Sequence, residues 1–435
     1  MTETGEGKGA LAGVKVVEFA QHYAVPYCGQ LLSDLGALVV KVEPPIGDPS
    51  RHYAASDIPF ESKVFAVINR GKRSVCLDLS KPDQARPVVD ALIRWADVAL
   101  VSFKPPDVPR YGLGYEDLSG FNPRLIYLQH VPFGPAGPMG DEGGFDPLVQ
   151  ALSGLSFLTA RTEHGVPMNV RPAYNDAGVG MLSALGVVAA LRHRDLTGEG
   201  QRVETHLLST ALAFALPTIH RFEDVDPPEF ERFEAHLVEL QSKGATFEEQ
   251  RALYDDTVLT GRHLLRLYFR NWETKDGLVA SAPLSTSLQV KFHAATGLPH
   301  PKEKGWAVGS KEWDELVEAA ERLFRTETTD TWLTVLRAAG VPCAPYNLPV
   351  DVFRDPQIEA NGFLIELEHP LLGRYQMPAP PLRMSRTPTR AQGPSPLLGA
   401  DTDQILDEVG LPAELIAQLR ESGLLGGSPK EAGSA

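Results

Sequence analysis

The sequence predicts an α/β fold with a parallel sheet of the Rossmann type. Two apolar runs, VKVVEF (14–19) and ALVVKVE (37–43), have the length and composition of buried parallel strands. Between them a helix is predicted from Pro26 to Leu35, because proline is favoured in the first turn of a helix. A strand–helix–strand unit of this kind places its two strands parallel to each other.

Similar units follow along the chain, with strands or helices predicted over 74–79, 82–95, 97–103, 125–131, 178–194 and 201–216. The last of these segments, QRVETHLLSTALAFAL, begins as a strand and continues as a helix. The alternation of strands and helices favours a sheet covered by helices on both faces.

The pattern changes after Pro217. Residues 221–260 are acid-rich and amphipathic, which predicts a solvated helical hairpin. WETKDGLVASAP (272–283) turns on Asp276 and Gly277 into a strand. Two further sets of helices are predicted, one near 288–296, 310–325 and 329–339, and one after a proline-punctuated tail at about 401–409 and 412–422. The C-terminal GGSPKEAGSA has a disordered composition.

Composition and charge limit the classes of function. The chain has 435 residues, of which 43% are hydrophobic and 22% charged, as in ordinary globular proteins. A net charge of −15 argues against nucleic-acid binding, and no run approaches the roughly 20 apolar residues of a membrane helix. The polar N-terminus predicts a cytoplasmic protein. Three scattered cysteines and the lack of an HExxH motif predict no metal site and no disulfide framework.

Basic residues recur beside the predicted strands. Lys72 and Arg73 stand just before one strand, and Lys104 and Arg110 stand just after another. Arg51 follows the second strand and could join them. Because ligands bind at the carboxyl ends of parallel strands, these side chains predict a local anion site for phosphates. The alternative for each residue alone is a solvated charge with an ion-pair partner.

A dinucleotide-dependent oxidoreductase is the alternative suggested by the first strand–helix–strand unit. Glu43 ends the second strand, where a ribose-binding acid often lies. The first turn, however, reads AQHYAVP and lacks the GxGxxG fingerprint. The sequence therefore disfavours this alternative.

Two aspartates stand where helices are predicted to begin. Asp146 ends the glycine- and proline-rich part of FGPAGPMGDEGGFDPLVQALSG (133–154), and the sequence leaves both an N-cap role and a functional role open for it. Asp176, in YNDAGVG, precedes a long helix. The helix dipole should lower its pKa, and free N–H groups could bind an oxyanion. The residues alone favour an N-cap and leave a nucleophile as the second interpretation.

Several motifs resemble those of the family III CoA-transferases, the formyl-CoA transferase and carnitine CoA-transferase group. They are LAGVKVVEFAQHYAVPYCGQLLSDLGALVVKVEPPIGDPSR, NRGKRSVCLDL, FKPPDVPRYGLGYEDLSGFNPRLIYLQ, FGPAGPMGD, LTGEGQRVETHLLSTAL, VPCAPYNLPVDVFRDPQ, EHPLLGRYQMPAPPLRMSRTP and PLLGADTDQIL. The resemblance covers nearly the whole chain except its termini and the acid-rich segment 221–260.

The resemblance implies transfer of coenzyme A from an acyl-CoA donor to a carboxylic acid. It selects Asp176 as the catalytic nucleophile, which forms a mixed anhydride and then an aspartyl-CoA thioester. CoA is a substrate, and no cofactor is bound permanently. The implied CoA-binding residues are His22, Tyr23, Ala24, Lys72, Arg73, Phe103, Lys104, Arg110, Tyr111, Phe145 and Asp146.

The resemblance also implies the domain plan and the assembly. A Rossmann-like large domain is expected from both chain ends, with its N-terminal part in 1–216 and its C-terminal part, after a return linker, in 341–435. A smaller α+β domain is expected in 217–340, and two chains are expected to interlock as a homodimer.

An α-methylacyl-CoA racemase is the alternative on this fold, although Phe145 replaces the histidine that racemases use. SAPLSTS (281–287) replaces a glycine-rich loop, which disfavours the formate and oxalate reaction. A CoA-binding protein without catalysis is disfavoured by the presence of Asp176.

Overall fold

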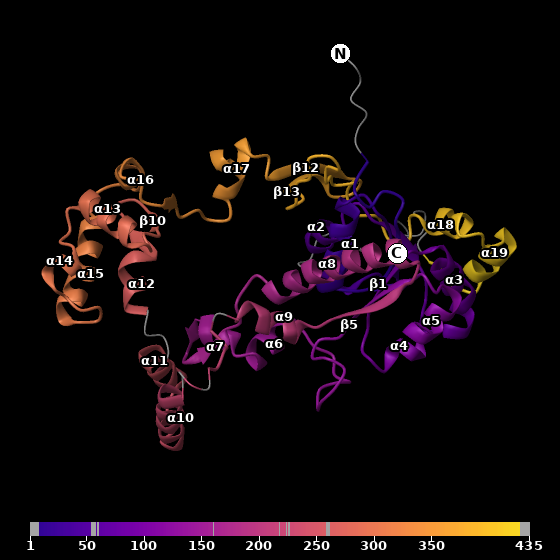
Figure 1. Cartoon of the computed structure of the whole chain (residues 1–435). Coiled ribbons are helices and arrows are strands. Elements are labelled where there is room, and N and C mark those ends of the chain that lie inside the picture. The colour runs from indigo at the N-terminus through magenta and orange to yellow at the C-terminus, as the bar shows by residue number, and fades with distance from the viewer. Residues whose placement is uncertain are drawn as a thin grey trace, which may run out of the picture. The chain divides into compact units, whose positions relative to one another are not determined.

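The computed structural model describes residues 8–53, 58, 61–159, 161–216, 218–222, 224, 227–257 and 262–426. The chain divides into two compact units (Figure 1). Unit 1 combines Met1–His220 with Asn361–Ala435, and unit 2 is Arg221–Ala360. Unit 2 extends past the expected division at 340 because Cys343–Pro345 pairs with another strand of that unit.

A six-stranded parallel sheet forms the centre of unit 1, in the order β3-β2-β1-β4-β5-β8. Its strands are β1 (Lys15–Ala20), β2 (Leu38–Glu43), β3 (Arg73–Cys76), β4 (Val98–Ser102), β5 (Ile126–His130) and β8 (Gln201–Thr205). The predicted parallel sheet is confirmed. The strand predicted over 74–79 is shorter, because the backbone N–H of Asp78 leaves the sheet to donate to the carbonyl of Leu424.

Helices cover both faces of this sheet. One face carries α1 (Ala24–Asp34) and α8 (Tyr174–Thr197), and the other α3 (Pro82–Trp95), α5 (Tyr115–Phe121), α18 (Thr402–Glu408) and α19 (Ala413–Glu421). The predicted helices in these regions are confirmed, as is α9 (Leu207–Phe214) after β8. The doubly wound core explains the near-continuous apolar strands.

Other elements of unit 1 are short, and most have no clear sequence signal. They are η1 (Pro49–His52), α2 (Lys63–Ile68), α4 (Asp107–Arg110), α6 (Asp146–Leu152), α7 (Leu155–Thr159), β6 (Thr162–Glu163), β7 (Val166–Pro167) and the antiparallel pair β12 (Leu364–His369) and β13 (Gly373–Pro378). The C-terminal helices are fixed to β3, where the N–H of Ser74 donates to Asp401 and that of Cys76 to Thr402.

Unit 2 has its own aromatic core. Trp272, Phe292, Trp313, Phe324 and Trp332 pack between a three-stranded antiparallel sheet and its helices. The elements are α10 (Pro227–Ser242), α11 (Phe247–Thr257), α12 (Arg262–Tyr268), β9 (Arg270–Glu273), β10 (Leu278–Ser281), α13 (Thr286–Thr296), α14 (Pro301–Lys304), α15 (Lys311–Phe324), α16 (Thr329–Ala338), β11 (Cys343–Pro345), η2 (Asp351–Arg354) and α17 (Pro356–Ala360). The predicted hairpin of α10 and α11 is confirmed, and the predicted disordered terminus from Gly427 onward lies outside the described residues.

Within the described residues, α8 is the helix whose length and composition would allow it to cross a membrane. Half of its most apolar window is buried inside the unit, where it packs on α1, β5 and β8. A helix in the core of a protein can have this length and apolar composition without crossing any membrane.

Candidate active site

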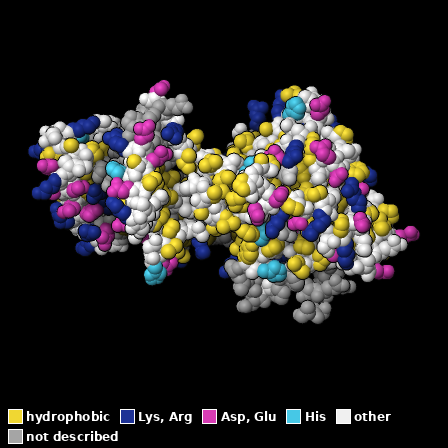
Figure 2. Space-filling model, turned by 90° about the horizontal axis from the view of Figure 1, so that it is seen from below, with side chains coloured by type: hydrophobic (Ala, Val, Ile, Leu, Met, Phe, Trp, Pro, Cys, Tyr) yellow, Lys and Arg dark blue, Asp and Glu magenta, His cyan; other side chains and the backbone are white. Residues whose placement is uncertain are grey.

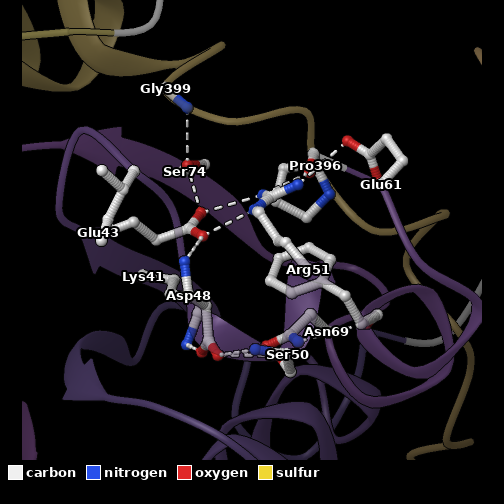
Figure 3. Close-up of polar contacts among 12 residues, drawn as sticks. Lys41, Glu43, Asp48, Ser50, Arg51, Glu61, Asn69, Ser74, Pro396 and Gly399 are labelled. Atoms are coloured by element: carbon white, nitrogen blue, oxygen red, sulfur yellow. Dashed lines mark hydrogen bonds and ion pairs between the residues drawn. The ribbon is translucent and has the colours of Figure 1, made fainter. Parts of the chain in front are cut away.

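A buried network of charges lies beneath the carboxyl ends of β1 and β2 (Figure 3). The Lys41 ammonium lies 2.9 Å from Glu18 and 2.8 Å from Asp48. The Arg51 guanidinium forms a fork on Glu43, at 2.7 and 3.0 Å, and donates to Glu61 at 2.9 Å. Arg51 therefore does not join an anion site, and Glu43 is not placed for a ribose.

Lys72 belongs to the same network. Its fully buried ammonium lies 2.8 Å from Glu18 and donates to the carbonyl of Pro26 and to Asn69. This geometry contradicts the prediction that Lys72 holds a phosphate, because all its donors face inward. Arg73, at the amino end of β3, is paired with Glu408 at 3.0 Å and lies outside the cavity described next.

A cavity of about 340 Å³ opens at the carboxyl edge of the sheet. Its walls come from the turns after β1, β4 and β5, the loop before α6, the start of α8 and the start of α9. Among the predicted site residues, those that line it are His22, Tyr23, Ala24, Phe103, Lys104, Tyr111, Phe145 and Asp176. Ser102, Asp107 and His130 also line it and were not predicted.

One side of the cavity, beyond β4, is basic and aromatic. The rings of Phe103 and Tyr111 meet edge to face at 5.2 Å, and the Arg110 guanidinium lies 4.8 Å from the Tyr111 ring. Arg110 is exposed and paired with Asp107 at 3.0 Å. Lys104 is exposed, and no ion pair is found for it among the described residues. Flat aromatic surfaces beside cations suit a nucleotide with its phosphates.

The start of α8 is capped by Asp146 from another part of the chain. One carboxylate oxygen of Asp146 accepts from the backbone N–H of Asn175 at 2.8 Å and of Asp176 at 3.2 Å. Its other oxygen accepts from Gln150. The N-cap position of α8 is Ala173 and that of α6 is Phe145, so neither Asp176 nor Asp146 is the N-cap of the helix to which it belongs. Both N-cap interpretations are wrong.

The pKa of Asp176 differs from the prediction. Burial, followed by the nearby charge of Asp146, raises the pKa of Asp176 to about 7, whereas the helix dipole was expected to lower it. Because Asp146 already accepts from the Asn175 and Asp176 amides and places a negative charge at the positive end of the helix, the dipole stabilises Asp176 less. These amides are also not free to bind an oxyanion.

The glycines that follow Asp176 serve packing within the protein. A Cβ on Gly178 would lie 2.5 Å from the Phe214 ring, and one on Gly180 would lie 2.7 Å from the Tyr27 ring. Gly178 therefore lets α9 approach α8, and Gly180 lets α1 approach it. These contacts account for the two glycines by helix packing within unit 1.

The chain matches CoA-transferase family III over residues 11–236 and 237–402. It therefore belongs to this family, and the resemblance of its motifs is confirmed. Among the described residues, no group of three or more His, Cys, Asp or Glu side chains is placed to hold a metal ion.

Relatives of known name agree with this family. The chain is 28% identical over 404 residues to succinyl-CoA:glutarate CoA-transferase of Homo sapiens, covering 92% of this chain and 86% of that protein. It is 30% identical over 426 residues to formyl-CoA:oxalate CoA-transferase of Rhodopseudomonas palustris strain BisA53, covering 96% and 97%. A crystal structure of a CAIB/BAIF family protein from Brucella suis matches with a TM-score of 0.71 at 28% identity, covering 92% of this chain and all of that one.

Proposed function

We propose that this protein moves coenzyme A from an acyl-CoA donor to a carboxylic acid through a covalent intermediate on Asp176. Membership of CoA-transferase family III supports CoA transfer, with CoA as a substrate and no permanently bound cofactor. The observation that carries the mechanism is that Asp176 lines one cavity together with the aromatic and basic residues after β4. A screen of acyl-CoA donors against carboxylic acids, with mass spectrometry of the CoA thioesters, tests the reaction.

The proposed reaction needs no separate general base, because each nucleophile reacts as an anion. The ionised Asp176 attacks the thioester carbon, the carbon–sulfur bond breaks, and CoA leaves as the thiolate. The thiolate then attacks the aspartyl carbonyl of the mixed anhydride, which releases the donor acid and leaves an aspartyl-CoA thioester. The acceptor carboxylate repeats these two steps in reverse. Covalent catalysis thus divides one difficult exchange into easier ones.

The rate should depend on the ionisation of Asp176. Because attack needs the carboxylate and the pKa of Asp176 is about 7, kcat/KM is expected to rise with pH through about 7 and then level off. Asp146→Asn removes the neighbouring negative charge, so the rise should move to lower pH. Asp141→Asn, in the exposed loop before α6, is the matched control and should leave the profile in place. A profile of Asp146→Asn that coincides with the wild type would contradict this electrostatic account.

Lys104 is expected to bind the phosphates of CoA. Lys104→Ala should raise the KM for acyl-CoA about tenfold, with kcat nearly unchanged, because a charged contact made equally in the ground and transition states is lost. This increase in KM should be smaller at high salt, and it should be absent when the substrate is an acyl-pantetheine, which has no nucleotide. An equal effect on both substrates would show that Lys104 acts elsewhere.

Racemisation of an acyl-CoA is the second candidate function. This candidate is supported by two histidines, His22 and His130, which line the cavity with Asp176. Either could act as the second acid–base group, a role that the side chain of Phe145 cannot fill. This reaction predicts exchange of the acyl α-proton with deuterated solvent when no acceptor acid is added. The absence of exchange under conditions that support CoA transfer would exclude it.

We also propose that two chains form an interlocked homodimer in the cytoplasm. On the exposed side of α8 and α9, apolar side chains face outward, including Met181, Leu182, Leu185, Leu212 and Phe214. Figure 2 shows hydrophobic side chains gathered on one face of unit 1. A second copy would cover such a surface. Light scattering should give twice the mass of the chain, and a stable monomer would contradict the assembly.

A further inference from the structure

The turn after β1 holds His22 in a conformation that side chains rarely adopt. Its φ is 69°, in the left-handed region, and its backbone N–H donates to Asp48 at 3.1 Å. Asp48 is buried and fixed in turn by Lys41 at 2.8 Å and by Ser50. The buried network of Figure 3 therefore sets the position of His22 at the cavity wall.

The ring of His22 is held as firmly as its backbone. Its Nδ1 lies 2.6 Å from the Tyr53 hydroxyl, the two rings stack at 5.9 Å, and the Phe145 ring meets it edge-on at 5.3 Å. Burial lowers the pKa of His22 and raises the pKa of Tyr53, so at neutral pH the imidazole is neutral and the phenol keeps its proton. A phenol hydroxyl is the stronger donor of this pair. We therefore assign Nδ1 as the acceptor and place the imidazole proton on Nε2.

This tautomer provides an N–H donor at the cavity wall. Among the described residues, no hydrogen bond is found for Nε2 of His22, and His22 lines the cavity with Asp176. The amides of Asn175 and Asp176 at the start of α8 are already bound to Asp146. Negative charge must nevertheless develop on the carbonyl oxygen when the Asp176 carboxylate attacks a thioester, and enzymes place N–H donors at such an oxygen.

We propose that His22 is a catalytic residue whose Nε2–H donates to the reacting carbonyl oxygen, and that Tyr53 is a positioning residue that fixes its tautomer. The inference rests on the proposed function of Asp176. The proton stays on Nε2 throughout; its hydrogen bond strengthens as the carbonyl oxygen becomes an oxyanion and weakens when the carbonyl re-forms. The same donor serves each addition, because all of them occur beside Asp176.

His22→Gly tests the donor directly. Glycine adopts a φ of 69° without strain, so the turn should survive while the ring is lost. We expect kcat to fall about 10²-fold, with the KM for acyl-CoA nearly unchanged. Added imidazole should restore kcat at least about tenfold, whereas N-methylimidazole, which has no N–H, should not. Rates without enzyme and with the His22→Gly, Asp176→Ala double variant give the background.

Tyr53→Phe is the second variant, and it removes an oxygen from a partly exposed side chain without disturbing the core. It should lower kcat about tenfold, and imidazole should not rescue it, because the His22 ring is still present. A value of kcat within threefold of the wild type in His22→Gly, or equal rescue by both imidazoles, would overturn the role of Nε2.

Trapping with hydroxylamine separates this inference from the mechanism on which it rests. An Asp176 adduct that forms in the wild type and forms more slowly in His22→Gly supports both the nucleophilic role of Asp176 and the donor role of His22. An adduct that forms equally fast in the two proteins overturns the role of His22 and leaves Asp176 as the nucleophile. A wild type that transfers CoA without any adduct overturns both.

Discussion

Asp176→Ala is expected to lower kcat for CoA transfer at least about 10⁴-fold, because loss of a covalent nucleophile removes the reaction path itself. The protein should still bind CoA, since the aromatic and basic residues after β4 are untouched. The measurement is the initial rate of formation of the new CoA thioester, with CoA binding followed separately by calorimetry.

Asp195→Ala is the matched control for this substitution. Asp195 is an exposed acid in the last turns of the same helix, α8, far along the sequence from the cavity lining. Its removal should leave kcat unchanged. If Asp176→Ala kept wild-type turnover with a competent pair of substrates, the aspartyl mechanism would be wrong.

Arg51→Met should give the largest loss of stability. The Arg51 side chain is fully buried between Glu43 and Glu61, with its guanidinium 3.6 Å from the centre of the Phe65 ring. Methionine fills part of the volume but leaves two buried carboxylates without their cation. Removing one partner from a buried ion pair typically costs about 3–5 kcal/mol. Chemical denaturation should show a decrease in the free energy of unfolding of that size.

Arg73→Met provides the comparison for Arg51→Met. Arg73 is paired with Glu408 at the surface, where both side chains are about one-third exposed. Its loss should change the free energy of unfolding by less than about 1 kcal/mol. Equal effects of the two substitutions would mean that the network of Figure 3 does not stabilise unit 1 in the way described.

The order of the main strands and helices could be predicted because it depends on local patterns. The strands β1, β2, β4 and β5 are buried on both faces of the sheet. Their sequences are therefore runs of consecutive, mostly apolar residues, which can be recognised without the structure. The pair β12 and β13 was missed because its strands are only partly buried and lie in a segment that was interpreted as a proline-punctuated tail. Propensity alone does not distinguish such a pair from a loop.

The candidate site could be predicted in part. The family resemblance placed Tyr111 correctly beside one cavity with Asp176. The carboxyl-edge rule did the same for Lys104. It failed for Lys72, whose buried partner Glu18 is 54 residues away in the sequence. The contacts of Asp146 with the start of α8 and of Tyr53 with His22 also join residues about 30 positions apart. No local pattern predicts such contacts. His130, which ends β5 within the strand predicted over 125–131, could however have been found by the carboxyl-edge rule.

The most direct test of the central claim is to trap the acyl-enzyme before an acceptor acid is present. The protein is incubated with acyl-CoA and hydroxylamine, and its peptides are sequenced by mass spectrometry. We expect a hydroxamate on Asp176, at a rate that matches turnover, and none in Asp176→Asn. Turnover that continues while Asp176 remains unmodified, or a hydroxamate on another carboxylate of the cavity, would contradict the proposed mechanism.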